Sequence, residues 1–526
     1  ATCPRLIPFT PPPQKKKSDP HIATMTLLII ISFFLILLLL ITLFLHSSNT
    51  SKPSHGFKTH PILGGLPEFL ANRHRFYDWT TDVILSHPTH TAILFSPGRV
   101  GVMTALPENV EHILKTRFDN YPKGPRFTSV FGDFLGSGIL NSDGDQWRIQ
   151  HRTASLTFSH RNLTTFVFDA IRSEIHTRLL PLLRVASQSG RVIDMQDVLE
   201  RFAFDNVCKA AFSVDPGCLA GDGSGESEFT RAFKEAATLT FERFMYVLPF
   251  LWKVKKIFNL GSEKRLRESI KIVHDFANNI IRLRLADKSG KDYQDLLSRF
   301  ISSCEINDLD FLRDVIVNVI LAGRDTTSSG LSWFFWVLSL NPDVVSKIRS
   351  EVDRIRKRAG KQAGDAFDYD DLKEMNYLHG AISESLRLYP PVPANLMVCL
   401  EDDVLPDKTE VKKGWFIGYH TYTMGRAESI WGKDYLEFRP ERWLDENGLY
   451  KPDSPFRFPV FHAGPRTCLG KEMAYIQMKS IAACVVEEFD LDVLGKQTRP
   501  EPLLSITMRI KGGLRVTVKG RTTCYN

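Results

Sequence analysis

The most informative segment of the chain reads Phe461-His462-Ala463-Gly464-Pro465-Arg466-Thr467-Cys468-Leu469-Gly470, and it leads into a predicted helix over 471–489. A cysteine just ahead of a helix N-terminus lies near backbone N–H groups and the positive end of the helix dipole, which favours its thiolate. Gly464 and Gly470 let the backbone approach a flat ligand, and Arg466 offers a fork of donors to a carboxylate. A buried structural cysteine would explain neither the glycines nor the arginine.

A phosphate-binding P-loop is the competing interpretation of this segment. Five residues separate Gly464 from Gly470-Lys471, and Glu472 stands where a P-loop requires Ser or Thr. The P-loop interpretation is therefore excluded.

The segment resembles the haem-binding signature of the cytochromes P450, F-x-x-G-x-R-x-C-x-G, whose fixed positions are met by Phe461, Gly464, Arg466, Cys468 and Gly470. Three further motifs of that family follow the expected order, and they are Ala322-Gly323-Arg324-Asp325-Thr326-Thr327, Glu384-Ser385-Leu386-Arg387 and Phe438-Arg439-Pro440-Glu441-Arg442-Trp443. The resemblance covers essentially the whole chain after residue 24. It implies a mainly α fold with small β-sheets and a haem b cofactor.

The resemblance also implies roles for the residues of these motifs. Cys468 would be the axial thiolate of the haem iron, with Ala322 and Gly323 beside the haem on the oxygen side. Asp325 and Thr326 would relay protons during oxygen activation. Glu384, Arg387 and Arg442 would form a buried structural triad.

The segment 312–338 reads as one long apolar helix, interrupted by Gly323 and a polar run over 324–329. A glycine inside a helix costs about 1 kcal/mol relative to alanine, so something must offset it. Either the helix packs closely against a neighbour there, or, as the resemblance implies, it widens locally where dioxygen and water lie. The second explanation is favoured, because an acid and a hydroxyl, Asp325 and Thr326, lie two and three residues after Gly323.

Two positions depart from the family pattern for binding the haem propionates. Trp147 is followed four residues later by His151, where the family usually has arginine, and Arg152 comes one residue later. The segment 396–399 lacks a basic residue that many relatives carry there. Arg466 and the helix that carries Trp147 and His151 are therefore the predicted propionate contacts, and the third contact, which a basic residue in 396–399 would have supplied, stays open.

Further segments resemble the plant ω-hydroxylases of this family, namely Tyr121-Pro122-Lys123-Gly124, Gly132-Asp133-Phe134-Leu135-Gly136 and Gly261-Ser262-Glu263-Lys264. Those enzymes act on fatty acids and jasmonoyl-amino-acid conjugates, and some relatives oxidise the side-chain terminus of sterols. The residues expected to face a substrate are Phe131, Phe134, Leu135, Val392, Ala394, Asn395, Ile506, Thr507 and Met508. Plain core packing is the competing explanation for each of them.

The first 67 residues are predicted to precede the globular body. From Met25 to Leu45, 18 of 21 residues are apolar and none is charged, which at 1.5 Å per residue gives a span of about 30 Å and predicts a transmembrane signal anchor. Residues 1–24 are interpreted as a leader, or as translated upstream sequence if Met25 is the start. Residues 46–67 form a Pro/Gly/Ser-rich hinge, and 68–526 form the body. The basic residues after the anchor predict a single-pass protein of the endoplasmic reticulum membrane with its body in the cytosol.

Composition limits the partners. The chain has 526 residues, 43% of them hydrophobic, and a formal charge of 67 − 60 = +7 that is spread along the sequence, which argues against nucleic acid and favours a membrane surface or an acidic protein. No dinucleotide or flavin fingerprint occurs, so electrons must come from a separate NADPH-dependent flavoprotein reductase. The reductase is expected to dock on the basic residues near the cysteine, which are Arg457, Arg466, Lys471 and Lys479. Lys471 and Lys479 lie eight residues apart and are predicted to share one helix face.

Outside the motifs, the pattern is mainly helical. A β-hairpin is expected from 91–95 and 100–104, loops over 215–226, 287–292 and 358–365, and strands near 411–419 and 503–518.

The sequence thus predicts a membrane-anchored haem-thiolate monooxygenase that hydroxylates the terminal carbon of a fatty acid or related amphipathic lipid. A sterol or triterpenoid side-chain hydroxylase is the main alternative. A reductase-independent haem-thiolate isomerase or dehydratase would have no use for the Asp325-Thr326 relay, and neither would a non-catalytic haem sensor.

Overall fold

The computed structural model describes residues 28, 31–35, 37, 56–57, 65–96, 99–157, 167–220, 227–246, 250–287, 293, 295–303 and 308–521. The predicted leader lies outside these residues, and so do most of the predicted anchor and hinge. Among the helices of the described part, none has the length and apolarity needed to cross a bilayer.

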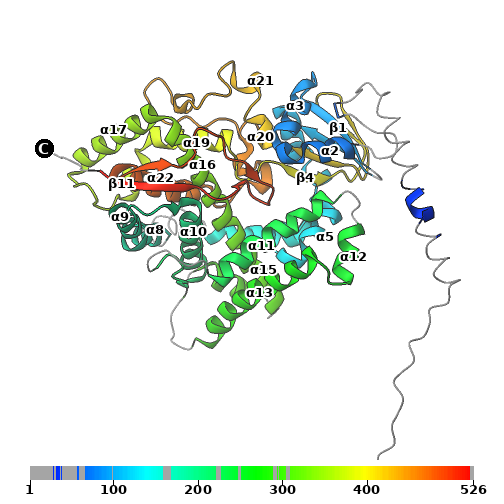
Figure 1. The fold of residues 1–526 in the computed structure, drawn as a ribbon, viewed down its shortest axis with the longest axis horizontal. Coiled ribbons are helices and arrows are strands. Elements are labelled where there is room, and N and C mark those ends of the chain that lie inside the picture. Colours follow the sequence, from blue (N-terminus) through cyan, green and yellow to red (C-terminus); the bar gives the residue numbers. More distant parts are fainter. Residues whose placement is uncertain are drawn as a thin grey trace, which may run out of the picture.

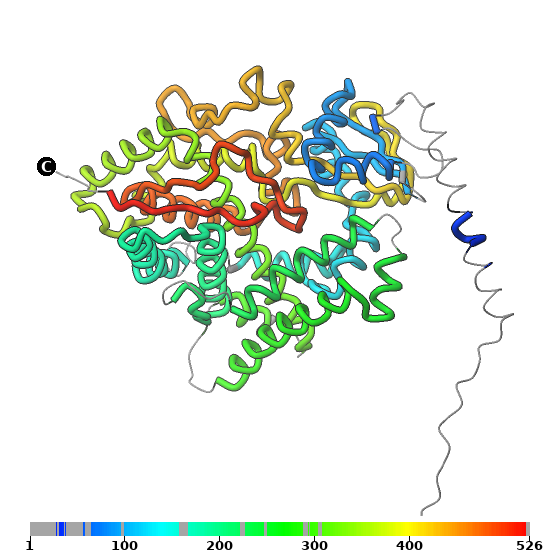
Figure 2. Tube along the Cα trace, in the orientation of Figure 1, coloured from blue at the N-terminus to red at the C-terminus, as the bar shows by residue number. Residues whose placement is uncertain are grey.

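Helices make up most of the body (Figures 1 and 2). In the first part of the chain they are α2 (Leu66–Asn72), α3 (Phe76–Ser86), α4 (Pro107–Glu111), α5 (Gly124–Leu135), α6 (Gly144–Thr157), α8 (Phe168–Glu174), α9 (Leu180–Ser189) and α10 (Met195–Phe212). They continue with α11 (Glu228–Glu242), α12 (Phe250–Ile257), α13 (Ser262–Ala286), α14 (Leu296–Ser303), α15 (Leu309–Ile320), α16 (Thr326–Leu340), α17 (Pro342–Ala359), α18 (Tyr369–Lys373), α19 (Asn376–Leu388), α20 (Thr421–Met424), α21 (Glu428–Trp431) and α22 (Lys471–Glu488). The mainly α class predicted from the sequence is confirmed.

The strands are short and form small sheets. They are β1 (Thr91–Ser96), β2 (Arg99–Thr104), β3 (Ile193–Asp194), β4 (Asn395–Val398), β5 (Asp403–Val404), β6 (Glu410–Val411), β7 (Phe416–Tyr419), β8 (Phe489–Val493), β9 (Pro502–Leu503), β10 (Arg509–Ile510) and β11 (Arg515–Gly520). The largest sheet has the order β1-β2-β7-β4, in which β2 and β7 are parallel. Figure 1 shows β1 and β4 beside α2 and α3 at one end of the molecule, away from α9 and α17.

Most of the predicted elements are present. The hairpin is formed by β1 and β2, which pair antiparallel. The strand expected over 411–419 is two short strands, β6 and β7, with a turn at Gly414 (φ 82°) between them. The strand region 503–518 is likewise divided between β9, β10 and β11, because Gly512 and Gly513 both adopt positive φ.

Helix starts follow from the local sequence. The side chain of Asp194 accepts hydrogen bonds from the backbone of Gln196 and Asp197 at the start of α10. Asp308 does the same for Asp310 and Phe311 at the start of α15. Each aspartate satisfies N–H groups that have no partner within the helix, so these positions begin helices well.

The predicted long helix over 312–338 is present as α15 and α16, joined by a π-helical turn, η8 (Leu321–Asp325). A π-turn inside an α-helix widens it locally. A Cβ on Gly323 would also lie 2.6 Å from Cγ2 of Val207 in α10. The predicted widening is present, and close helix packing, the explanation that was not favoured, also applies, because both occur at Gly323.

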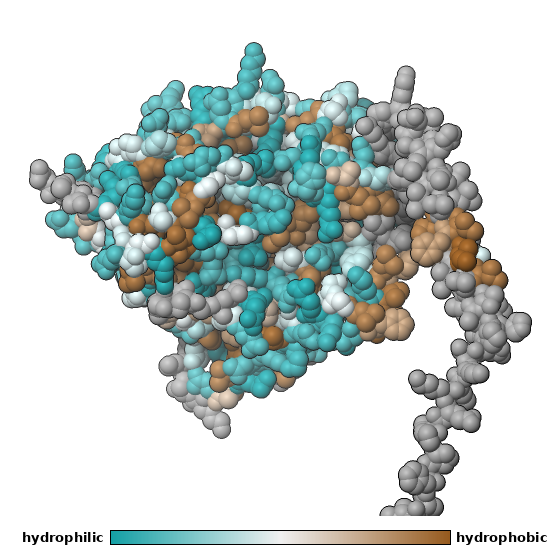
Figure 3. Space-filling view, viewed as in Figure 1, coloured by the Kyte–Doolittle hydropathy of each residue, from teal (hydrophilic) through white to brown (hydrophobic). Residues whose placement is uncertain are grey.

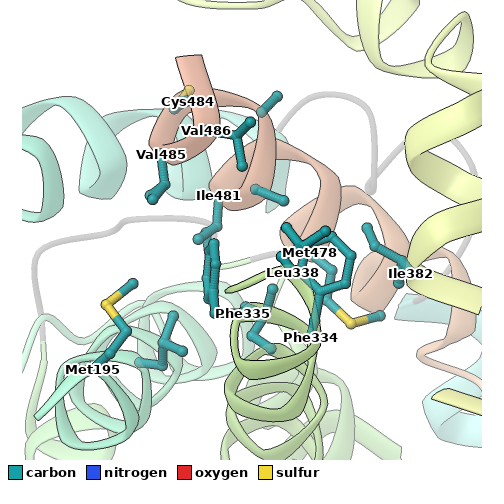
Figure 4. Close-up of a cluster of buried hydrophobic side chains, with 14 of the residues drawn as sticks. Met195, Phe334, Phe335, Leu338, Ile382, Met478, Ile481, Cys484, Val485 and Val486 are labelled. Carbon is teal, nitrogen blue, oxygen red and sulfur yellow. The ribbon is translucent and has the colours of Figure 1, made fainter. Parts of the chain in front are cut away.

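The core around α16 and α22 fixes the position of the cysteine segment. Figure 4 shows Phe334, Phe335 and Leu338 of α16 facing Met478 and Ile481 of α22. These side chains are at most 4% exposed and belong to one buried hydrophobic cluster. Burying such side chains contributes about 1.5–3 kcal/mol each, so α22 and the segment preceding it are held firmly against α16.

Candidate active site

A cavity of about 660 Å³ lies between the α15–α16 helix and the segment that precedes α22. Its wall contains Ala322, Gly323 and Thr326 from the helix. From the segment before α22 it contains Phe461, Arg466, Cys468, Leu469 and Gly470. The two motifs that the sequence singled out therefore face one common space.

Cys468 is held at the end of the segment by its backbone. Its N–H donates to the carbonyl of Phe461 at 2.8 Å, and α22 begins three residues later. Burial raises the pKa of the Cys468 thiol, while a hydrogen bond from the backbone of Gly470 and the charge of Lys471 act in the opposite direction. The thiol therefore needs a further positive centre, such as a metal ion, to become a stable thiolate.

The two glycines of the segment have different roles. Gly464 has a φ of 64°, and a Cβ there would lie 2.1 Å from the carbonyl oxygen of Leu114. The turn and the close packing on Leu114 therefore require glycine at position 464. This role differs from the expected one, in which the glycine lets the backbone approach a flat ligand. Gly470 has a negative φ of −88°, and the nearest atom to a Cβ there would be Sγ of Cys468, at 3.9 Å.

A polar group of side chains lines the cavity next to the cysteine segment. Nη2 of Arg466 donates to Asp143 at 2.6 Å, and the guanidinium lies 4.4 Å from the Trp147 ring centre. The rings of Trp147 and His151 are 5.0 Å apart. Nε2 of His151 is buried in the cavity wall and has no hydrogen-bond partner among the described residues. This unsatisfied nitrogen is suited to a polar ligand group.

Lys123 and His462 belong to the same group, although the sequence did not assign them a role. Both line the cavity. Burial and the nearby charge of Arg466 lower the pKa of Lys123 to about 8, and burial lowers the pKa of His462 to about 4. Lys123 supplies a cation near Arg466, where the sequence analysis left the third propionate contact open. The lysine was visible in the segment 121–124, but its proximity to Arg466 depends on the tertiary fold.

The two residues of the predicted proton relay are placed differently. Thr326 lines the cavity, and its Oγ1 donates to the carbonyl of Ala322 at 2.7 Å. Asp325 is 3% exposed and does not line the cavity, because its carboxylate pairs with the adjacent Arg324 at 2.5 Å. Burial raises the pKa of Asp325. The structure therefore brings the hydroxyl to the cavity and leaves the acid behind it.

Asp325 belongs to a buried charge network. Arg324 also contacts Glu200 at 3.2 Å, and Glu200 is bound by Arg509 at 2.7 Å. Two arginines thus face two carboxylates in the interior, which satisfies charges that would be costly to bury alone.

The predicted structural triad is a single hydrogen-bonded cluster. Arg387 binds both oxygens of Glu384, at 2.7 and 2.8 Å, and Arg442 reaches the same carboxylate at 3.3 Å. Trp443 adds a hydrogen bond from Nε1 at 2.9 Å. Arg387 also donates to the carbonyls of Tyr435 and Glu437, so it ties α19 to the segment that leads into the cysteine segment. The cluster does not line the cavity, which agrees with a structural role.

Most of the residues expected to face a substrate line the cavity, namely Phe131, Leu135, Val392, Ala394, Asn395, Ile506 and Thr507. Phe134 and Met508 do not, and their prediction was wrong. Phe134 packs on Phe233 of α11 with ring centres 5.3 Å apart, so neighbouring helix packing and not the cavity takes up its ring. Met508 is fully buried, and its carbonyl accepts hydrogen bonds from Ser329 and Trp333.

The predicted docking cluster near the cysteine is also corrected. Lys479 is 6% exposed, and its ammonium donates to the carbonyl of Leu372 at 2.6 Å. Helix α22 is covered by neighbouring helices here, so a lysine on it cannot reach a partner protein. Lys471 at the start of α22 is partly exposed, with its Nζ 6.0 Å from the Phe461 ring centre.

Comparison with known proteins identifies the family to which the chain belongs. The family model described as Cytochrome P450 matches residues 55–516. The chain belongs to the cytochrome P450 family. Among similar proteins, Cytochrome P450 CYP94D108 of Paris polyphylla is 49% identical over 90% of this chain and 93% of its own length. Cytochrome P450 94A1 of Vicia sativa is 41% identical over 88% and 90%, and Cytochrome P450 94B1 of Arabidopsis thaliana is 43% identical over 91% and 93%. The chain is therefore a P450 monooxygenase, and it is related to the CYP94 group of cytochromes P450.

The donors in the cavity wall fit the haem of a P450. Cys468 offers the thiolate ligand, and Arg466, Trp147, Lys123 and the unsatisfied His151 offer donors to the two propionates. When bound, the haem iron supplies the activation of dioxygen that the side chains of this chain cannot perform themselves. The residues of the cavity wall would hold the cofactor, and Thr326 is the predicted proton donor, since its hydroxyl lies in that wall.

Proposed function

We propose that this P450 hydroxylates the terminal carbon of a fatty acid or a related amphipathic lipid. The observation that carries the proposal is the apolar wall of the cavity beyond Cys468 and Thr326. Aromatic and aliphatic side chains from distant segments form it, including Phe127, Phe131, Leu135, Phe241, Phe244, Phe300, Val315 and Ile506. Such a wall suits a flexible hydrocarbon chain, because it offers contact area and few polar partners.

The electrons are proposed to come from NADPH through a separate flavoprotein reductase. The chain carries no fingerprint for a dinucleotide or a flavin, so the reducing equivalents need an external carrier. Lys471, which lies three residues after Cys468, is the basic residue best placed to meet an acidic partner on that side. The docking is expected to weaken as salt rises, because exposed charges are screened over about 10 Å at 0.1 M ionic strength.

The protein is proposed to act at the endoplasmic reticulum membrane as a single-pass protein with its body in the cytosol. The apolar run from Met25 to Leu45 supports this location. A patch of exposed apolar side chains on α12 and the residues after it gives independent support, and it comprises Phe250, Leu251, Val254, Ile257, Phe258 and Leu260. Figure 3 shows apolar surface at the corner of the body where Figure 1 places α12. Such a patch is suited to a lipid surface.

The test is turnover by the purified holoenzyme with a plant reductase and NADPH, using a panel of fatty acids, jasmonoyl-isoleucine and sterols. The proposal predicts a terminal alcohol from an acid substrate and no product without reductase. Oxidation restricted to the sterols would establish a side-chain hydroxylase instead. Rearrangement of a hydroperoxide without NADPH would establish an isomerase or dehydratase.

A further inference from the structure

Two arginines line the cavity without a carboxylate partner. Arg99 begins β2 and Arg126 lies in the first turn of α5. Neither makes an ion pair or a side-chain hydrogen bond with any residue that the structure describes. Most arginines in the interior of this protein are paired, as Arg243 is with Glu263 and Arg356 with Glu487.

The surroundings of Arg126 are apolar. Its guanidinium carbon lies 5.5 Å from the ring centre of Phe244 and 5.9 Å from that of Phe416. Burial and the nearby charge of Arg99 lower the pKa of Arg126 to about 10, and burial lowers the pKa of Arg99 as well. The aromatic faces offset only part of the cost of removing these cations from water. Two neighbouring cations in such a place are complementary to an anion.

This pair is separate from the polar group beside the cysteine segment. Arg126 lies 5.9 Å from the ring centre of Phe416 at the start of β7, whereas the ring of Tyr419 at the end of that strand lies 5.9 Å from that of His462 in the cysteine segment. In agreement, the pKa of Lys123 is lowered by the charge of Arg466 and that of Arg126 by the charge of Arg99. Lys123 is therefore assigned to the haem end of the cavity, and Arg126 with Arg99 to another part of its wall.

The strand register shows how far that part lies from the cysteine segment. The ring of Tyr419 is 5.9 Å from that of His462, so the Tyr419 end of β7 lies beside the cysteine segment. In the parallel pair of β2 and β7, Thr104 is opposite Tyr419 and Gly101 is opposite Phe416, and Arg99 lies two residues further out. At about 3.3 Å per residue, Arg99 is roughly 16 Å along the sheet from the Tyr419 end. That length matches an extended acyl chain.

We propose that Arg126 and Arg99 bind the carboxylate of the substrate at the end of the cavity opposite Cys468. This inference rests on the proposed function and adds the polar group that the substrate must carry. With the carboxylate held there, the methyl end of the chain points toward Cys468 and Thr326, so the terminal carbon is the one presented for hydroxylation. Free fatty acids and acyl-amino-acid conjugates share this carboxylate, and sterols lack it.

The experiment compares a carboxylate with a neutral ligand of the same chain length. Dodecanoic acid and dodecanol are titrated into the detergent-solubilised holoenzyme, and affinity is read from the change in the haem absorption spectrum. The variants are Arg126→Gln, Arg99→Gln and Arg126→Lys. Arg265→Gln is the matched control, because Arg265 is 64% exposed on α13 and lies outside the cavity.

The proposal predicts that Arg126→Gln weakens binding of the acid by roughly 10- to 100-fold, as expected for a lost charge-assisted hydrogen bond. Arg99→Gln should weaken it less, because Arg99 is less deeply enclosed by the protein than Arg126. Arg126→Lys should retain part of the affinity because it keeps the charge. Dodecanol should bind all variants about equally, and Arg265→Gln should match the wild type for both ligands. The same titration with N-dodecanoyl-isoleucine shows which carboxylate source the wild type binds more tightly.

An equal loss for acid and alcohol, or no loss for the acid in both glutamine variants, would overturn the anchor. If the wild type still hydroxylates the acid in that case, the proposed function stands without the anchor. A wild type that neither binds nor oxidises any acid substrate would overturn both.

Discussion

Cys468 is the predicted ligand of the haem iron, and it is the only cysteine among the described residues that lines the cavity. Cys468→Ser should abolish the absorption band of the reduced carbon monoxide complex that gives the family its name, since a hydroxyl does not replace the thiolate ligand. The measurement is the carbon monoxide difference spectrum of the purified protein.

Cys484 provides the matched control. It lies on α22, which begins three residues after Cys468, but it is buried in the core, as Figure 4 shows, and burial raises its pKa to about 12. Cys484→Ala should keep the band and lower the free energy of unfolding by roughly 1 kcal/mol through lost packing. A normal band in Cys468→Ser would show that another residue ligates the iron.

Thr326 is the predicted proton donor that the structure places in the cavity wall. Thr326→Ala should keep the haem but slow proton transfer by about 10²–10⁴-fold, so that NADPH is consumed to form hydrogen peroxide. Thr326→Ser, which restores the hydroxyl, should recover much of the coupling. The measurement is the ratio of product to NADPH consumed, and an unchanged ratio in Thr326→Ala would contradict the role.

Residue identities at this site were largely predictable from the sequence, because the motifs fix Cys468, Arg466 and Thr326 at short spacings. The positively charged residues that other segments contribute to the cavity were not predictable from the sequence. Lys123 and Arg126 lie more than 300 residues before the cysteine segment, and only the packing of α5 on the sheet brings them to the cavity. The orientation of Asp325 was not predictable either, because its side chain pairs with Arg324 and does not face the cavity.

At the scale of elements, the close contact between η8 and α10 can be tested through Gly323 and Val207. Gly323→Ala would place a Cβ 2.6 Å from Cγ2 of Val207, so it should lower the free energy of unfolding by roughly 1–3 kcal/mol despite the better helix propensity of alanine. The double variant Gly323→Ala/Val207→Ala should be more stable than the two single effects predict, because the alanine at 207 makes room. Denaturant unfolding of the four proteins measures this coupling, and strict additivity would rule out the contact as the reason for glycine.

Helix α22 contains a second testable feature, the buried Lys479. Its pKa is lowered from 10.5 to about 8, mainly by burial, so the folded state binds fewer protons than the unfolded state between these values. The free energy of unfolding should therefore rise from pH 8 to pH 10.5, by up to about 3 kcal/mol, relative to Lys479→Met. Unfolding of both proteins across this range measures the difference, and a difference independent of pH would mean that Lys479 titrates normally.

The helical periodicity of α5 indicates most of its side chains that line the cavity. Phe127, Phe131 and Leu135 recur at intervals of four on α5 and all line the cavity. Phe134 follows Phe131 by three residues and is equally compatible with that face, but it packs on Phe233 of α11 instead. The short strands were harder to delimit, since two-residue strands such as β5, β6 and β9 carry no alternation to detect. Their positions depend on pairing with distant strands.

At the scale of the whole molecule, the fold gives the cavity two chemically different ends. Near Cys468, the donors of Arg466, His151 and Lys123 suit the cofactor. Far along the β2–β7 sheet, Arg99 and Arg126 suit a carboxylate, and apolar side chains line the wall between. A substrate held in this way is oriented before it reacts, which is what selective attack on an unactivated terminal carbon requires.

The most direct measurement of this account is turnover of dodecanoic acid under oxygen-18 gas, with purified holoenzyme, reductase and NADPH. The account predicts one product, the acid with a terminal hydroxyl that carries a single heavy oxygen atom, and no product when the reductase is omitted. A product whose new oxygen comes from water, or one formed equally well without reductase, would contradict it.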